Sequence, residues 1–168
     1  MSVIEHKKEA PKQVGCMIIT VSDTRTEETD KSGQLIRKFL EEAGHHVARY
    51  AIVKDEREAI ARAIEAGAED ANVQAILLNG GTGIAKRDVT YEVVASVLTK
   101  ELPGFGEIFR MLSYTEDIGS AAILSRAIAG VYKDRAVFSM PGSSGAVRLA
   151  MSKLVIPELG HVLREIYK

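Results

Sequence analysis

The chain has 168 residues and almost balanced charge, with 22 Lys and Arg against 23 Asp and Glu. This length is typical of a single domain, which buries roughly two-thirds of the surface that its unfolded chain exposes. The balanced charge argues against nucleic-acid partners, which require a basic footprint. No apolar stretch approaches the roughly 18 residues that a membrane-spanning helix needs.

The first twelve residues are polar up to Lys12 and lack the apolar core of a signal peptide. They predict a flexible N-terminal arm at 1–12, followed by a single domain at 13–168. The only cysteine, Cys16, lies in an apolar run, so we expect a buried thiol and no intramolecular disulfide. Together these features predict a cytoplasmic protein.

Strands and helices alternate in the first part of the chain. Short apolar or alternating runs predict strands at 14–21, 46–53 and 74–78. A helix follows each strand: the first ends before Gly44, the second opens at Asp55, and the third covers 91–102. This alternation predicts a parallel α/β sheet with right-handed crossovers.

The pattern changes after Glu101. We expect the turn at 103–106 to break the third helix, and short helices to follow. A β-hairpin then turns at Lys133 and Asp134. The expected later elements lie at 107–112, 120–127 and 146–154, with a final helix that starts at Pro157 and ends at Ile166.

The most informative segment runs from Gly80 to Thr90, between an apolar strand and an amphipathic helix. Glycines let backbone N–H groups approach a phosphate closely, and a helix N-terminus adds unpaired donors and partial positive charge. Lys86 and Arg87 add formal charge, and Asp88 supplies a carboxylate of the kind that Mg²⁺ accepts beside phosphate oxygens. The segment predicts a pocket for a phosphorylated ligand, and we expect a nucleotide.

This segment differs from the two commonest phosphate motifs. A Walker A loop needs Ser or Thr after its Lys, whereas Arg87 follows Lys86. Lys86 also stands where the dinucleotide fingerprint has its third glycine, so nothing but the strand–glycine–helix shape favours a nicotinamide-dependent oxidoreductase. A tight connection that binds nothing is the structural alternative.

Four loops leave the carboxyl ends of the expected strands, at 22–33, 54–55, 80–90 and 141–145. Ligands of parallel sheets bind at that edge, so we expect these loops to converge on one site. Structural alternatives stay open for several of their polar residues. Asp88 or Thr90 could cap the third helix, Asp55 the second with Glu58 in a capping box, and Ser143 or Ser144 the helix after 145.

The four histidines show no metal-ligand spacing. His45 and His46 are adjacent, so on a strand they point to opposite faces. His6 lies in the expected arm and His161 near the C-terminus. We therefore expect no histidine metal site.

Several motifs occur together and in order. They are Thr20-Val21-Ser22-Asp23, Asp30-x-Ser32-Gly33, Gly80-Gly81-Thr82-Gly83, Arg87-Asp88-Val89-Thr90, Pro103-Gly104-Phe105-Gly106-Glu107, Ala122-Ile123-Leu124-Ser125-Arg126 and Pro141-Gly142. From Val14 onward the chain resembles the MoaB/MogA family of molybdenum cofactor biosynthesis, which is related to the G domain of gephyrin.

The resemblance implies a three-layer α/β/α fold, with a mostly parallel sheet, helices on both faces and a small β-hairpin near the C-terminal part. The domain at 13–168 would bind molybdopterin and form a homotrimer or homohexamer. It would adenylylate molybdopterin with ATP and Mg²⁺, release pyrophosphate and serve a downstream molybdenum insertase. No tightly bound metal or organic cofactor is expected. The alternative is a non-catalytic molybdopterin carrier of the same pathway.

The same resemblance implies roles for individual residues. Asp88 and Asp55 would be catalytic, and Asp88 would hold Mg²⁺. The nucleotide phosphates would contact Gly80, Gly81, Thr82, Gly83, Arg87 and Thr90. Molybdopterin would contact Ser22, Asp23, Asp30, Ser32, Gly33, Pro141, Gly142, Ser143 and Ser144.

Overall fold

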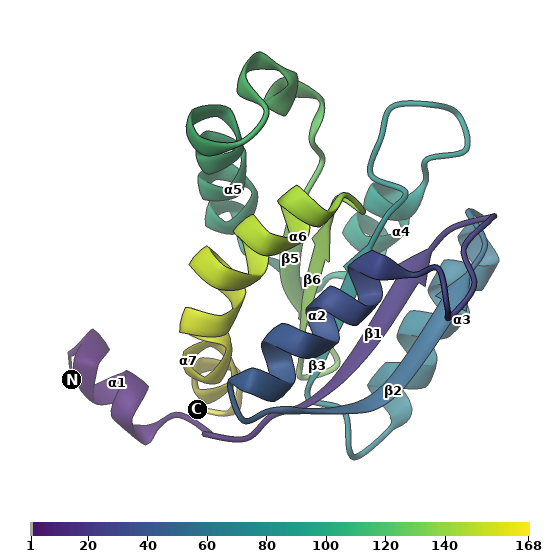
Figure 1. The fold of residues 1–168 in the computed structure, drawn as a ribbon. Helices are drawn as coiled ribbons and strands as arrows, with labels where there is room; N and C mark the ends of the chain where they lie inside the picture. The colour runs from purple at the N-terminus through teal and green to yellow at the C-terminus, as the bar shows by residue number, and fades with distance from the viewer. Residues whose placement is uncertain (1) are drawn as a thin grey trace.

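A six-stranded sheet forms the middle layer of the computed structural model, which describes residues 2–168 (Figure 1). The strand order is β2-β1-β3-β6-β5-β4. The first four strands in this order run parallel, and β5 and β4 follow in antiparallel pairing. The strands are β1 (Gly15–Val21), β2 (His46–Val53), β3 (Ala75–Asn79), β4 (Lys100–Glu101), β5 (Ile128–Tyr132) and β6 (Arg135–Met140).

Helices cover both faces of this sheet, which confirms the three-layer α/β/α fold. The helices α2 (Lys31–Glu42), α5 (Pro103–Glu116), α6 (Ser144–Ala150) and α7 (Ile156–Tyr167) pack on one face. The helices α3 (Arg57–Glu69) and α4 (Thr90–Val97) pack on the other.

The central strand β1 shows why the sheet needs both layers. All seven of its residues are buried. Cys16 and Ile18 join the core under α2, whereas Met17 and Ile19 join the core under α3. Because successive side chains of a strand point to opposite faces, a strand covered on both sides reads as the continuous apolar run seen in this sequence.

The expected hairpin is present as β5 and β6. Lys133 and Asp134 at its turn have φ of 46° and 61°, the left-handed pair that a two-residue hairpin turn requires. This reversal makes β5 antiparallel to β6, and β4, which pairs antiparallel with β5, runs in the same direction as the four parallel strands.

Two expected helices differ in the structure. The third helix ends at Val97 because Leu98 is extended, and Lys100 and Glu101 instead pair with β5. Pro103 then begins α5 instead of breaking a helix, since proline is tolerated in the first helical turn. The predicted helix at 120–127 is a 3₁₀ helix, η1 (Gly119–Leu124).

At the C-terminal end, α6 and α7 are joined without a break by a π-helical turn, η2 (Met151–Val155). Pro157 lies in the first turn of α7. A proline inside a regular α-helix clashes with the carbonyl four residues earlier, and the wider π turn just before it relieves that clash. The expected two helices therefore form one bent rod.

The expected N-terminal arm at 1–12, whose first residue lies outside the described residues, contains a helix, α1 (Val3–Glu9). Ser2 and Glu5 form a reciprocal capping box, with Ser2 N donating to Glu5 at 2.6 Å and Glu5 N donating to Ser2 Oγ at 3.2 Å. This Ser-x-x-Glu signal is visible in the sequence, and it outweighs the polar composition. Across residues 2–168, no helix has the length and apolarity to span a membrane.

Candidate functional site

The four predicted loops meet at the carboxyl edge of the parallel strands, as expected. They enclose a cavity of about 270 Å³. Its lining residues are Val21, Ser22, Asp23, Thr24, Arg25, Asp55, Gly80, Gly81, Arg87, Asp88 and Gly142. Polar residues that are far apart in the sequence therefore line one cavity.

Gly80 and Gly81 shape the floor of this cavity. Both have positive φ, at 94° and 69°. A Cβ on Gly80 would lie 2.4 Å from the Val21 carbonyl oxygen, and one on Gly81 would lie 2.2 Å from Thr90 Oγ1. Only glycine fits these two positions, and both glycines line the cavity with backbone atoms alone.

Thr90 begins α4, but its side chain does not cap the helix. The N-cap residue is Val89, with no side-chain hydrogen bond, which excludes both expected caps, Asp88 and Thr90. The Thr90 hydroxyl is buried and has no hydrogen-bond partner within the described residues. An unpaired buried hydroxyl is costly, and this one lies against Gly81 at the cavity.

Three carboxylates gather around the same cavity, from Asp23, Asp55 and Asp88. Asp55 is not the helix cap that its spacing suggested, because Glu56 holds the cap position of α3 without a side-chain hydrogen bond. Burial raises the pKa of Asp55, and the negative charges of Asp23 and Asp88 raise it further, while Arg87 opposes them. Repulsion of this kind marks a functional site more often than a stabilising feature.

These carboxylates have the chemistry that Mg²⁺ prefers, since that ion takes oxygen ligands from one or two carboxylates, phosphate and water. Asp88 Oδ2 also accepts a hydrogen bond from Ala85 N at 3.0 Å, which orients its side chain within the loop. Asp55 and Asp88 therefore offer the type of oxygen ligand that Mg²⁺ takes.

Arg126 holds the segment at 80–90, the glycine loop, by hydrogen bonds to its backbone, although Arg126 does not line the loop cavity. No sequence pattern predicted this role. Its guanidinium donates to the carbonyl oxygens of Thr82 at 3.3 Å, Gly83 at 2.6 Å and Asp88 at 3.1 Å. It also pairs with Glu92 and lies 5.2 Å from the centroid of the Tyr91 ring. Its only signal in the sequence is its place in the motif at 122–126.

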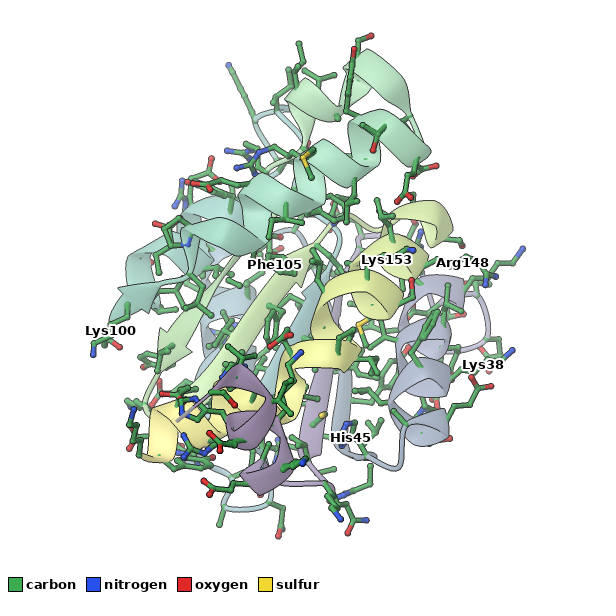
Figure 2. The ribbon with its side chains drawn as sticks, turned by 90° about the vertical axis from the view of Figure 1, so that its left-hand side faces the viewer. Lys38, His45, Lys100, Phe105, Arg148 and Lys153 are labelled. Atoms are coloured by element: carbon green, nitrogen blue, oxygen red, sulfur yellow. The ribbon has the colours of Figure 1, made fainter. Side chains whose placement is uncertain are left out.

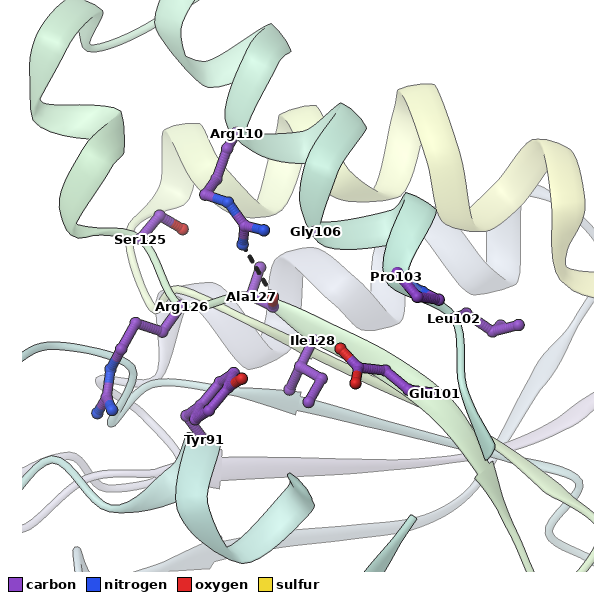
Figure 3. A pocket seen from close by; sticks show the side chains of 10 residues that line it. All are labelled: Tyr91, Glu101, Leu102, Pro103, Gly106, Arg110, Ser125, Arg126, Ala127 and Ile128. Atoms are coloured by element: carbon purple, nitrogen blue, oxygen red, sulfur yellow. Dashed lines mark hydrogen bonds between the residues drawn. The ribbon is translucent and has the colours of Figure 1, made fainter. Parts of the chain in front are cut away.

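A second cavity of about 270 Å³ lies next to Arg126 (Figure 3). Arg110 and Glu101 line it from opposite sides, and Arg110 donates to the Ala127 carbonyl at 3.3 Å. In this view the Arg126 side chain extends away from Arg110. Arg126 thus separates this cavity from the glycine loop.

The residues expected at molybdopterin divide into two groups. Ser22, Asp23 and Gly142 line the loop cavity, and Ser22 Oγ accepts from the backbone N–H of Thr24 and Arg25. Ser32 is buried and donates to the Gly142 carbonyl at 2.5 Å. This hydrogen bond therefore connects α2 to the loop at 141–145.

Asp30 has a structural role. It is fully buried, and it accepts hydrogen bonds from Thr20 Oγ1 at 2.6 Å, from Gly33 N at 3.0 Å and from the Tyr50 hydroxyl. A Cβ at Gly33 would lie 2.1 Å from the Asp30 carboxylate. Asp30 is the N-cap of α2, and it does not line the cavity.

Ser143 is likewise a helix cap, since its hydroxyl accepts from Ala146 N at 3.2 Å at the start of α6. Ser144 lines a shallow groove of about 370 Å³ with Lys31, Lys38 and Arg148. Lys38 and Arg148 extend from α2 and α6 on this side of the molecule (Figure 2). Pro141 directly precedes the turn between β6 and α6.

The fold and the loop cavity define an α/β protein with a cavity lined by charged side chains at the carboxyl edge of its sheet. Residues 17–161 match the family described as "Probable molybdopterin binding domain". The chain is 70% identical to molybdenum cofactor biosynthesis protein B of Bacillus subtilis (strain 168), over all of this chain and 99% of that protein. It is 66% identical to the protein of the same description from Halalkalibacterium halodurans, with the same coverage.

Solved structures agree. A crystal structure of molybdenum cofactor biosynthesis protein B superposes with a TM-score of 0.92 at 62% identity, covering 95% of this chain and 99% of that one. The tungsten cofactor synthesizing protein MoaB from Pyrococcus furiosus superposes with a TM-score of 0.80 at 37% identity, covering 95% and 100%. The chain belongs to this molybdopterin-binding domain family of molybdenum cofactor biosynthesis.

Proposed function

We propose that this protein is a molybdopterin adenylyltransferase. In this reaction an oxygen of the terminal phosphate of molybdopterin attacks the α-phosphorus of ATP. The bond between the α-phosphorus and the bridging oxygen to the β-phosphate breaks, and pyrophosphate leaves with the released electron pair. Adenylyl-molybdopterin is the other product.

The observation that carries this proposal is the meeting of a glycine loop and three carboxylates in one cavity. Phosphoryl transfer needs positioning and charge neutralisation more than covalent catalysis. The backbone N–H of Gly81 and the Arg87 guanidinium would bind phosphate oxygens, whereas the Gly80 N–H already donates to the Met140 carbonyl at 3.1 Å. Asp55 and Asp88 would hold Mg²⁺, which supplies positive charge to the phosphates.

The alternative function is a carrier that binds molybdopterin without turning it over. The Asp55 and Asp88 carboxylates favour the enzyme. Without a metal ion they would repel the anionic molybdopterin, so they would weaken binding in a protein that only carries it. We propose further that the protein acts in the cytoplasm and passes its product to a downstream molybdenum insertase.

We also propose that the protein self-associates, as a trimer or as a hexamer. Six exposed apolar side chains lie on α5, on η1 and at the junction between them. They are Ile108, Met111, Tyr114, Ile118, Ile123 and Leu124. Exposed apolar surface of this extent on neighbouring elements is typical of a protein interface.

An Asp88→Asn variant separates the enzyme from the carrier. We expect it to lower molybdopterin-dependent ATP turnover by at least about 100-fold, since removing one electrostatic group from such a site commonly has that effect. Molybdopterin affinity should change little. Asp134→Asn is the matched control, because Asp134 is exposed at a hairpin turn whose left-handed backbone asparagine also accepts. Unchanged turnover in Asp88→Asn would contradict the role of Asp88, and a parent protein that binds molybdopterin without measurable ATP turnover would favour the carrier.

A further inference from the structure

His6 and His161 are brought together where α1 packs against α7, although they are 155 residues apart in the sequence. Figure 2 shows α1 lying over α7, and Figure 1 places it beside the C-terminus. The two imidazoles and the Glu165 carboxylate each offer a ligand atom, and these atoms lie within 4.8 Å of one another. From this cluster we infer a binding site for a divalent transition-metal ion of the Zn²⁺ type, remote from the loop cavity.

The geometry centres on Glu165. Its Oε1 lies 2.9 Å from His6 Nδ1 and 3.9 Å from His161 Nε2. The two rings are tilted by 60° with centroids 5.7 Å apart, so they converge on the carboxylate instead of stacking. Ligand atoms around a tetrahedral Zn²⁺ ion at about 2.0–2.2 Å lie roughly 3.3–3.5 Å apart. Small side-chain rotations reach that spacing.

A second carboxylate orients one of the histidines. His161 Nδ1 lies 2.9 Å from Glu158 Oε2, which leaves Nε2 facing Glu165. Metal-binding histidines almost always donate their other ring N–H to a carboxylate, a carbonyl or water, and this bond fixes the tautomer. Glu158 is itself held by Lys7 of α1, at 2.5 Å. The cluster thus has outer support as well as ligands.

Two residues of α7, Gly160 and Arg164, allow the N-terminal segment to pack against this helix. Gly160 lies between Glu158 and His161, and a Cβ there would be 2.6 Å from the Pro11 carbonyl oxygen. Glycine in the interior of a helix costs stability, and here it allows the segment after α1 to lie against α7. Arg164 adds an ion pair to Glu9 at 2.7 Å.

Ligand type selects the ion. Imidazole suits Zn²⁺, Cu²⁺ and Ni²⁺, whereas Mg²⁺ prefers oxygen ligands alone. Cys16 does not compete, because it is buried and burial raises the pKa of its thiol to about 12. His161 also borders two cavities open to solvent, which gives an ion access and leaves room for water as a fourth ligand. Arg164 and Lys168 pair with Glu165 and moderate the affinity.

The site is tested by titrating untagged protein with Zn²⁺ in the presence of excess Mg²⁺. We expect one Zn²⁺ per chain, with micromolar affinity. The imidazole NMR signals of His6 and His161 should shift, while those of His45 and His46 stay in place. Bound Zn²⁺ should also slow tryptic cleavage after Lys8, because it fixes α1 to α7.

Variants distinguish ligands from bystanders. His6→Gln and His161→Gln should each weaken Zn²⁺ binding by at least about tenfold, and Glu158→Gln by about tenfold through loss of orientation. His46→Gln, at an exposed position away from the cluster, should bind as the parent does. Equal binding by all four variants, or histidine signals that do not respond to Zn²⁺, would overturn the site.

Discussion

At the scale of single residues, the surroundings of Asp55 disfavour the charged form of its carboxylate. Desolvation raises its pKa, and Asp23 and Asp88 add repulsion. Such a group binds protons more tightly in the folded than in the unfolded state, so its ionisation weakens the fold as the pH rises through the raised pKa. A carboxylate in this position is explained by ligand chemistry, since it does not serve stability.

Replacing Asp55 with Asn should therefore raise the melting temperature at pH 7 without Mg²⁺, whereas most substitutions lower it. The gain should shrink as the pH falls through the pKa of Asp55, because the parent side chain then becomes neutral. Thermal unfolding between pH 4 and pH 8 measures both effects.

Asp70→Asn is the control of opposite sign. The backbone N–H of Asn72 and then the nearby Arg49 hold the pKa of Asp70 below its usual value. Its charge therefore stabilises the fold at neutral pH, and this contribution is lost as the pH falls through the lowered pKa. A melting temperature at pH 7 that falls in Asp55→Asn as it does in Asp70→Asn would contradict the repulsion.

At the scale of elements, the sequence predicted the strands well because apolar runs and alternation report burial directly. The loops at 22–33, 54–55, 80–90 and 141–145 were also predicted to converge, since parallel strands place their carboxyl ends on one edge. The sequence could not separate caps from ligand residues. Asp30 and Ser143 turn out to cap helices, whereas Asp55 does not.

Contacts between distant segments account for what the sequence did not predict. Arg126 donates hydrogen bonds to three carbonyl oxygens of the loop at 80–90, which lies about 40 residues earlier in the chain. No local sequence pattern predicts a contact over that separation. The pairing of 100–101 with β5 ended a helix whose pattern continued past Val97. In the N-terminal segment, by contrast, the capping-box pattern of Ser2 and Glu5 is present in the sequence and would have predicted the start of α1.

The glycine loop itself gives a sharp prediction. Gly81→Ala should weaken ATP binding by at least tenfold and destabilise the fold by about 2 kcal/mol or more, since the new Cβ adds a clash with Thr90 to the strain at positive φ. Gly44→Ala is the matched control. Gly44 also has positive φ, but a Cβ there meets nothing within 4 Å.

Gly44→Ala should thus cost only about 1–2 kcal/mol and leave ATP affinity unchanged. Denaturant unfolding and calorimetric ATP titration compare the two variants. Equal effects of both substitutions on ATP binding would contradict the role of the Gly81 backbone.

At the scale of the whole molecule, the exposed apolar side chains on α5 and η1 are not explained by the packing of a single chain. Ile123 is 84% exposed, and Met111 is 56% exposed. Burial between subunits would remove this area from water at roughly 25 cal/mol per Å².

Light scattering should therefore give the mass of a trimer or hexamer, and Met111→Glu with Ile123→Asp should shift the protein toward monomer. Tyr167→Asp, at an exposed position on α7 away from this surface, should leave the mass unchanged. A parent protein that is monomeric at micromolar concentration would contradict the assembly.

The central claim is adenylyl transfer in the loop cavity. It is tested most directly by incubating the protein with ATP, Mg²⁺ and molybdopterin, and by measuring pyrophosphate together with the mass of the pterin product. We expect pyrophosphate and adenylyl-molybdopterin in equal amounts, both dependent on the pterin. Folded protein that binds molybdopterin but releases no pyrophosphate would contradict it.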